Sequence, residues 1–271
     1  MTGKQDASVE NNANSPAELV SLVLELKVSK EKPAARGVPS WWGRAAHALL
    51  LRVIQAQDTG MAQDLHEENA QRPFTASTLM GSFPSRRLDP QSIYRLRLTG
   101  LNSGVSGLLM KAVEGEGGLR AGSHIDLDGF TFAIQQVSLA QEGVAWSAST
   151  DYQSLAMQNL TASQAPPRRI TLQFTSPVTF KSGGKMMPIP LPELVFGSLL
   201  DRWNHFAPIS FSADLRRYAV ECLAVERYRL STRPVETKGG GLRIGAVGEV
   251  SYLALNYDRY WMSLVLSLIH I

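Results

Sequence analysis

Cysteine is almost absent from this chain of 271 residues, because Cys222 is the only one. A single cysteine excludes an intramolecular disulfide and a cysteine-based zinc site, and this usage is typical of a reducing compartment. Long apolar runs are missing too. The longest one near a chain end, residues 264–271, is far shorter than the roughly 20 residues that cross a bilayer. The polar N-terminus has no signal-peptide pattern, so we expect a cytoplasmic protein without a membrane partner.

Several signatures of catalysis are also missing. The chain has no nucleophile elbow, no H-x-x-x-H pair and no cluster of carboxylates at the spacing of metal ligands. A hydrolase with a serine triad and a metal-centred enzyme are therefore poorly supported. We expect no metal and no cofactor.

The net charge of +3 hides an asymmetry between two parts of the chain. Residues 1–167 hold 14 Lys+Arg and 16 Asp+Glu, a balance of −2, whereas residues 168–271 hold 13 and 8, a balance of +5. A basic surface favours a polyanion such as nucleic acid, because each neutralised phosphate releases counterions. The alternative is a solvated basic face without a ligand.

The hydrophobic pattern predicts a disordered lead at residues 1–16, which are polar, and a first domain at residues 17–163. The order in this domain is strand, helix, strand, strand, helix, strand, which is typical of a ferredoxin-like unit. The main elements are expected at residues 19–28, 41–57, 74–79, 93–98, 105–113 and 125–139.

A second domain at residues 168–271 begins in the same way. A strand is expected at 170–174, a helix at 194–206, a long hairpin from 219–230 and 242–255, and a helix at 257–268. A strand after that helix would complete the pattern, and no residues remain for it. We therefore predict an α+β protein with two tandem ferredoxin-like (RRM-like) domains, the second incomplete.

Three short motifs carry a resemblance to a known family. They are MAQDLHE at 61–67 followed by RPFT at 72–75, FTSPVTF at 174–180, and GAVGEVSY at 245–252. In this order and at these intervals they resemble the Cas-six type of CRISPR-associated endoribonuclease, a member of the RAMP superfamily. The family's glycine-rich loop after the last helix is absent, so we expect a chain truncated at its C-terminus.

The resemblance implies a nuclease of CRISPR antiviral defence that processes precursor crRNA. Such an enzyme cleaves CRISPR repeat RNA without a metal, because the 2′-hydroxyl attacks the adjacent phosphate and leaves a cyclic phosphate. One alternative is a non-catalytic RNA-binding RAMP subunit, whose partners would include other CRISPR effector proteins, and another is an inactive truncated copy. A monomer and a homodimer both remain open.

The resemblance also implies site residues. His66 matches a family histidine that transfers protons, and histidine suits this work because its ordinary pKa is about 6.5. Arg72 takes the place of a family lysine and would stabilise charge on the phosphate. His47 lies on the apolar stripe of the first helix, where it is either a reserve acid or base or a hydrogen-bonded core residue.

Basic residues of the second domain are the candidates for RNA binding. Alternation places Arg227 and Arg229 on one face of a strand, from which they could reach phosphates and 2′-hydroxyls of an RNA stem. The alternative is a solvated strand face. The full set is Arg168, Arg169, Arg216, Arg217, Arg227, Arg229, Arg233 and Lys238.

Overall fold

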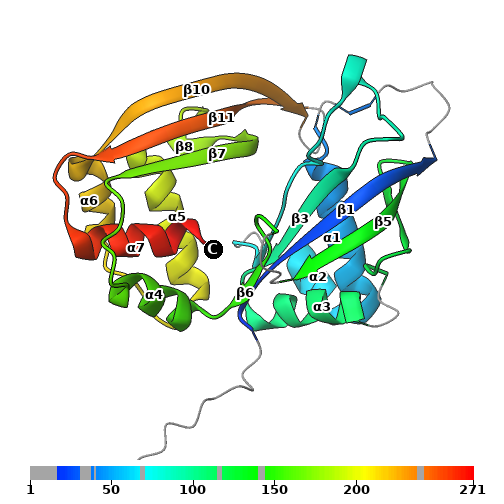
Figure 1. The fold of residues 1–271 in the computed structure, drawn as a ribbon, viewed down its shortest axis with the longest axis horizontal. Coiled ribbons are helices and arrows are strands. Elements are labelled where there is room, and N and C mark those ends of the chain that lie inside the picture. Colours follow the sequence, from blue (N-terminus) through cyan, green and yellow to red (C-terminus); the bar gives the residue numbers. More distant parts are fainter. Residues whose placement is uncertain are drawn as a thin grey trace, which may run out of the picture.

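The computed structural model describes residues 17–30, 38–39, 41–67, 71–114, 118–139, 144–236 and 241–271. The predicted disordered lead at residues 1–16 and the candidate Lys238 lie outside these ranges. The chain forms two lobes that lie side by side, each with an antiparallel sheet and its own group of helices (Figure 1).

The first lobe is built on a sheet of order β2-β3-β1-β5-β4, with β6 also paired to β1. Its strands are β1 (Leu19–Lys30), β2 (Phe74–Ala76), β3 (Tyr94–Gly100), β4 (His124–Leu127), β5 (Phe130–Leu139) and β6 (Ala148–Thr150). Its helices are α1 (Gly43–Gln57), α2 (Thr59–Glu67) and α3 (Ser103–Glu114), with a short 3-10 turn at Pro84–Arg86.

The hydrophobic pattern explains why these elements pack as they do. On β1, Leu22, Leu24 and Leu26 alternate and are fully buried, because successive strand residues point to opposite faces. On α1, Leu50 and Ile54 are four residues apart and fully buried in the same cluster. The apolar face of the sheet and the apolar stripe of the helix therefore form the first core.

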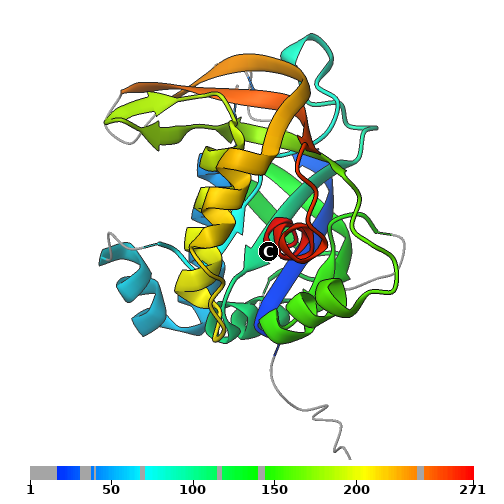
Figure 2. The same cartoon turned by 90° about the vertical axis from the view of Figure 1, so that its left-hand side faces the viewer.

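The second lobe is built on a three-stranded sheet, among the described residues, of order β10-β11-β7. The strands are β7 (Arg169–Val178), β10 (Leu223–Glu236) and β11 (Leu242–Ala254), with a separate small hairpin of β8 (Phe180–Ser182) and β9 (Lys185–Met187). The helices are α4 (Tyr152–Thr161), α5 (Pro192–Phe206), α6 (Asp214–Cys222) and α7 (Arg259–Ile269). Figure 2 shows α5 and α6 beneath the β10–β11 hairpin and α7 almost end-on.

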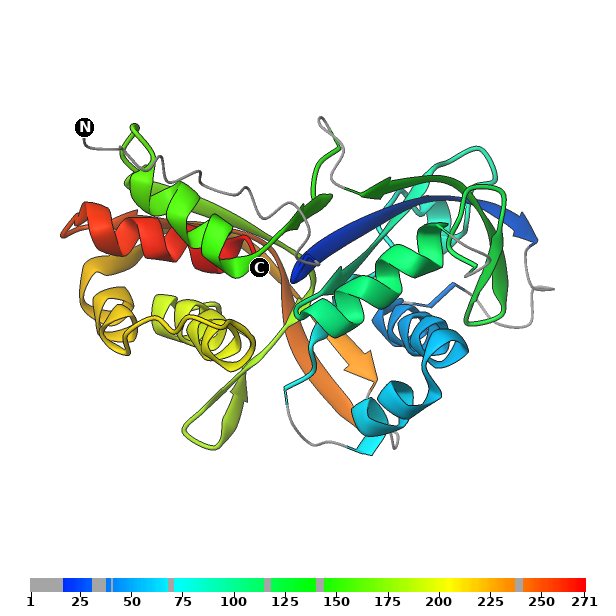
Figure 3. The same cartoon turned by 90° about the horizontal axis from the view of Figure 1, so that it is seen from below.

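The second core contains residues from both lobes. Leu19 and Leu101, at the ends of first-lobe strands, are buried in the same cluster as Trp203 of α5. The Tyr152 hydroxyl donates a hydrogen bond to the Leu101 carbonyl at 2.8 Å, and its ring packs edge-on against Trp203 at 4.9 Å. Helix α4 lies along α7 (Figure 3), whereas the predicted boundary at 163–168 assigned it to the first domain. That boundary stays a prediction.

The predicted fold class, α+β with tandem ferredoxin-like domains, is confirmed. One predicted element is wrong: residues 219–222 form the end of α6, not the start of a strand. Leu215 and Ala219 of this helix are buried one turn apart, which is a helical spacing. As a result Arg216 and Arg217 lie on a helix rather than beside a strand. In the part of the chain that the structure describes, no helix has the length and apolar character needed to cross a membrane.

Candidate functional site

Two of the predicted site residues meet in the first lobe. His47 lies in the second turn of α1, and Arg72 lies just before β2. Arg72 Nη1 donates a hydrogen bond to His47 Nε2 at 2.9 Å. Phe74 supports both side chains: its ring centre is 5.3 Å from that of His47 and 6.0 Å from the Arg72 guanidinium carbon. Both polar residues are half-buried, so solvent reaches them.

The direction of this hydrogen bond defines the chemical state of the pair. An arginine can only donate, so His47 Nε2 must carry its lone pair, and the neutral ring then has its proton on Nδ1. A neutral imidazole can take a proton from a hydroxyl, and a guanidinium can stabilise negative charge on a phosphate. The pair therefore combines a proton acceptor with a permanent cation.

His66, the favoured histidine of the sequence prediction, lies in the last turn of α2. This helix packs against α1, which carries His47. The side chain of His66 lies outside the described part of the molecule. Its role stays a prediction.

Three exposed arginines share one face of β10. The register pairs Arg227 with Ser251 and Arg229 with Glu249 on β11, and directly paired residues point to the same face of a sheet. Arg233 follows Arg229 by four residues and lies on that face as well. None of the three forms an ion pair with a described residue. We call these three residues the β10 arginines.

The other candidate arginines have local partners. Arg168 stacks on the ring of Tyr257 with 4.9 Å between its guanidinium carbon and the ring centre. The remaining ion pairs are Arg169 with Glu226, Arg216 with Asp201, and Arg217 with Asp214. The hydrogen bond from Arg169 also lowers the pKa of the Glu226 carboxyl. Nearby carboxylates therefore balance three of these candidate charges, whereas none of the β10 arginines pairs with a described carboxylate.

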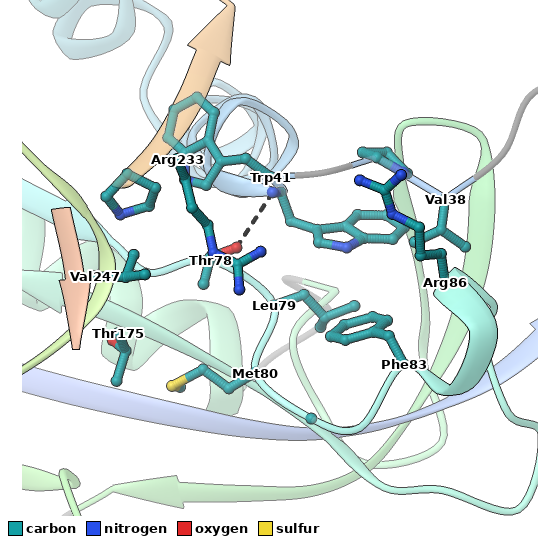
Figure 4. Close-up of a pocket in the computed structure, with 14 residues that line it drawn as sticks. Val38, Trp41, Thr78, Leu79, Met80, Phe83, Arg86, Thr175, Arg233 and Val247 are labelled. Atoms are coloured by element: carbon teal, nitrogen blue, oxygen red, sulfur yellow. Dashed lines mark hydrogen bonds between the residues drawn. The ribbon is translucent and has the colours of Figure 1, made fainter. Parts of the chain in front are cut away.

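A hollow of about 320 Å³ lies where the lobes meet. Arg233 reaches into it from the second lobe, and the first lobe contributes Trp41, Phe83 and Arg86 (Figure 4). Thr78 also lines the hollow, and its hydroxyl accepts a hydrogen bond from the Trp42 backbone N–H at 3.2 Å. In the ranges that the structure covers, no group of three or more His, Cys, Asp or Glu side chains is arranged to hold a metal ion.

The sequence prediction did not include the first-lobe residues of this hollow, nor Arg97 of β3. Alternation shows that Arg97 points away from the core formed by Leu96 and Leu98. It does not show that a second lobe covers that face. The missing information is the relative placement of the lobes, which a local pattern cannot contain.

Known proteins resemble this chain in two ways. Residues 172–269 match the family model described as CRISPR-associated endoribonuclease Cas6. Thermus thermophilus Cas6 superposes with a TM-score of 0.64 and 23% identity, covering 94% of this chain and 90% of that one. No curated protein sequence matches the chain.

Two solved complexes are similar to the chain as well. A product complex of the same Cas6 gives a TM-score of 0.67 and 25% identity, covering 93% of this chain and 91% of that one. A product complex of a second Cas6 gives a TM-score of 0.67 and 23% identity, covering 92% of this chain and 89% of that one. The family model matches the second lobe, and the shared fold extends over both lobes. By these two findings the chain is similar to Cas6 endoribonucleases in the sequence of its second lobe and in the fold of both lobes.

Proposed function

We propose that this protein cleaves CRISPR repeat RNA at the pair formed by His47 and Arg72. The observation that carries the proposal is the contact between these side chains, which places a neutral imidazole beside a guanidinium on a half-exposed surface. The similar solved structures support the substrate class, because they include two Cas6 product complexes and a Cas6 substrate mimic complex.

The proposed reaction needs only groups of the protein and the RNA. His47 Nε2 takes the proton of a 2′-hydroxyl, whose oxygen attacks the adjacent phosphorus while the bond to the 5′-oxygen breaks. Arg72 turns to the phosphate and stabilises its developing charge. The leaving oxygen takes a proton and becomes a 5′-hydroxyl, and the other product ends in a cyclic 2′,3′-phosphate. We assign the proton donor to His66 on the family resemblance alone.

The β10 arginines are proposed to hold the RNA stem. Their face is exposed and carries three cations without ion-pair partners among the described residues. An A-form stem presents phosphates and 2′-hydroxyls across its wide minor groove, so a row of arginines can bind it with little dependence on base sequence. We assign weaker contributions to RNA binding to the four candidate arginines that already have a local partner, which are Arg168, Arg169, Arg216 and Arg217.

The test is single-turnover cleavage of labelled repeat RNA from the same genome, in EDTA. We expect the parent chain to cut, and His47→Gln to cut about 10²–10⁴-fold more slowly, because general-base catalysis contributes that much. Glutamine retains an oxygen that can accept the bond from Arg72, so the pair keeps its packing. His124→Gln is the matched control, because His124 is exposed on β4 and distant in sequence from the site.

Further RNA and protein variants separate the parts of the mechanism. RNA with a 2′-deoxy nucleotide at the cut site should resist cleavage, because the nucleophile is missing. Arg72→Gln should slow the reaction about 10²–10³-fold, as loss of a transition-state donor does. His66→Ala tests the proton donor independently. If His47→Gln cuts as fast as the His124→Gln control, the assignment of the base is wrong.

The two alternative functions give a different pattern. Tight binding of repeat RNA with no cutting by the parent chain would indicate a non-catalytic RNA-binding subunit. A chain that neither binds nor cuts, and that unfolds over a broad temperature range, would indicate an inactive copy.

A further inference from the structure

Strand β10 forms the outer edge of the second-lobe sheet (Figure 1). It pairs with β11 on one side, and no described strand pairs with its other side. A register shift between Val225 and Arg227 interrupts the regular pairing at one end, and Pro234, which has no N–H to donate, limits the edge at the other. Residues 227–233, which we call the β10 edge, therefore present backbone N–H and C=O groups that β11 does not use.

The two faces of the β10 edge differ in chemistry. One face carries the β10 arginines, which are exposed and have no ion-pair partner among the described residues. The other face carries Leu230 and Tyr228, whose side chain is 70% exposed. Because side chains alternate along a strand, a further strand beside β10 would also present one set of side chains to each face.

A hollow of about 370 Å³ adjoins the apolar face of the β10 edge. It is lined by Tyr228 and Leu230 of β10, by Val250 of β11, and by residues 188–191, which lead into α5. No charged side chain is among the described residues that line it. This hollow is therefore suited to apolar side chains rather than to an anion.

Exposed apolar side chains extend this surface beyond the hollow. Ile189, which lines the hollow, is 53% exposed. Ile244 of β11 is directly paired with Pro234 and therefore lies on the same face of the sheet, where it is 44% exposed. A contiguous exposed apolar surface of this kind is typical of a site where another molecule binds.

The charge of the arginine face decides which kind of strand fits the edge. A second copy of this chain, paired antiparallel as the strands of this sheet are, would place its own β10 arginines beside the first set. Like charges opposite each other on paired strands are destabilising, and charged residues on an edge commonly prevent such self-pairing. A strand with carboxylates on that face would instead gain charge-assisted hydrogen bonds. Charge complementarity therefore favours an acidic strand over a second copy.

We propose that the β10 edge binds an extended strand of a partner protein, in which acidic and apolar residues alternate. The backbone of this strand pairs with β10, its carboxylates contact the β10 arginines, and its apolar side chains pack in the hollow against Tyr228 and Ile189. RNA fits the arginines alone, because it has neither the backbone groups of a strand nor apolar side chains for the hollow. This inference goes beyond the proposed function. Since both ligands use the β10 arginines, an occupied edge excludes an RNA stem from that face.

The experiment uses short synthetic peptides with a fluorescent label and blocked ends. The first has four Glu-Val repeats, so that an extended conformation places glutamate on one face and valine on the other. The second has four Lys-Val repeats. The third has the composition of the first, with its glutamates in one block and its valines in another. Fluorescence anisotropy gives the dissociation constant of each peptide from the parent chain at one salt concentration.

We expect the first peptide to bind about 10-fold more tightly than the other two, because only its charges and its apolar side chains match both faces of the edge. Methylation of peptide backbone nitrogens tests strand pairing without any change in the protein. One alternating set of methylated amides should abolish binding, and the other set should leave it intact, because only every second residue bonds to a neighbouring strand. A block peptide that binds as tightly as the first, or binding that tolerates both methylated sets, would identify a simple polyanion site and overturn the proposal.

Protein variants locate the bound peptide. Arg229→Gln should weaken binding of the first peptide about 2- to 5-fold, the usual contribution of one cross-strand charge pair. Tyr228→Ser changes an exposed side chain and should weaken it about 3- to 10-fold, through loss of an aromatic contact. Arg217→Gln is the matched control, because it removes the same charge from α6, where Arg217 pairs with Asp214. If this control weakens binding as much as Arg229→Gln does, the peptide responds to net charge alone and the proposal is wrong.

Sedimentation velocity of the parent chain tests the other occupant, a second copy. A monomer that binds the first peptide supports the proposal. If the chain instead forms a dimer that Tyr228→Ser dissociates, the edge and its hollow pair with a second copy, and the proposal of an acidic partner strand is wrong. The proposed nuclease function fails or survives separately, because peptide binding is measured without RNA.

Discussion

Substitution of Gly248 tests whether the geometry of the second-lobe sheet, which carries the β10 arginines, depends on one backbone position. Gly248 lies in β11 at a shift in register against β7, and its φ is 128°. A Cβ built at this position would come within 2.1 Å of the Arg229 carbonyl oxygen on β10. No real Cβ tolerates that distance from backbone, so Gly248→Ala requires the two strands to separate.

The magnitude follows from two contributions. A residue with a side chain in this region of φ costs about 1–3 kcal/mol, and relief of an overpacked contact costs about 1–3 kcal/mol more. The total of about 2–6 kcal/mol is a large part of a typical stability of about 5–15 kcal/mol. At about 2–4 °C per kcal/mol for a chain of this size, we expect the melting temperature to fall by about 5–20 °C.

The assay is thermal unfolding followed by circular dichroism, with Gly107→Ala as the matched control. Gly107 lies inside α3, and a Cβ there would meet no atom within 4 Å. Alanine has the better helix propensity, so this variant should be more stable by about 0.5–1 kcal/mol. A Gly248→Ala protein that melts within about 2 °C of the parent would refute the reasoning, since that shift is below the smallest expected.

Two further predictions concern charge. Arg229→Gln should weaken RNA binding and reduce the slope of log affinity against log salt by about 1, whereas Arg216→Gln, whose partner is Asp201, should change that slope little; titrations at several salt concentrations measure both. Asp151 caps α4, and the hydrogen bond from the Ser154 side chain lowers the pKa of its carboxyl. A carboxyl whose pKa is lowered in the folded state stabilises the fold fully only at pH values above its ordinary pKa of about 4. At pH 7, Asp151→Ala should therefore lower the free energy of unfolding by about 0.5–2 kcal/mol, the usual contribution of a helix N-cap. This difference should disappear as the pH falls through the lowered pKa, and unfolding at pH 7 and pH 3 would show whether it does.

Most helices and strands of the fold can be predicted from the spacing of apolar residues along the sequence. The alternation from Leu22 to Leu26 predicts β1, and the spacing of Leu50 and Ile54 predicts α1, because each pattern matches one regular structure. Helix α6 was missed because it is short and runs directly into β10 at Leu223, so that its last turn reads as part of the strand. Local pattern does not mark such a change of structure without a turn residue.

The candidate site could be predicted in part. The sequence identified His47 and Arg72, but only the fold shows that residues 25 positions apart in the chain form a hydrogen bond. The basic strand was predicted from its alternation, while the ion pairs that neutralise Arg169 and Arg216 depend on partners from other elements. Arg97 could not be selected at all, since its environment is made by β7 of the other lobe.

The second core also determines how the lobes can move. Tyr152 follows β6 of the first lobe, yet its ring packs on Trp203 and its hydroxyl is bonded to Leu101. A hinge motion between the lobes would expose these buried surfaces and break that bond. This shared core therefore holds the hollow where the lobes meet near the width that the structure shows. A preorganised hollow loses less free energy to ordering when it binds, so its affinity depends on how well a ligand fits rather than on closure around it.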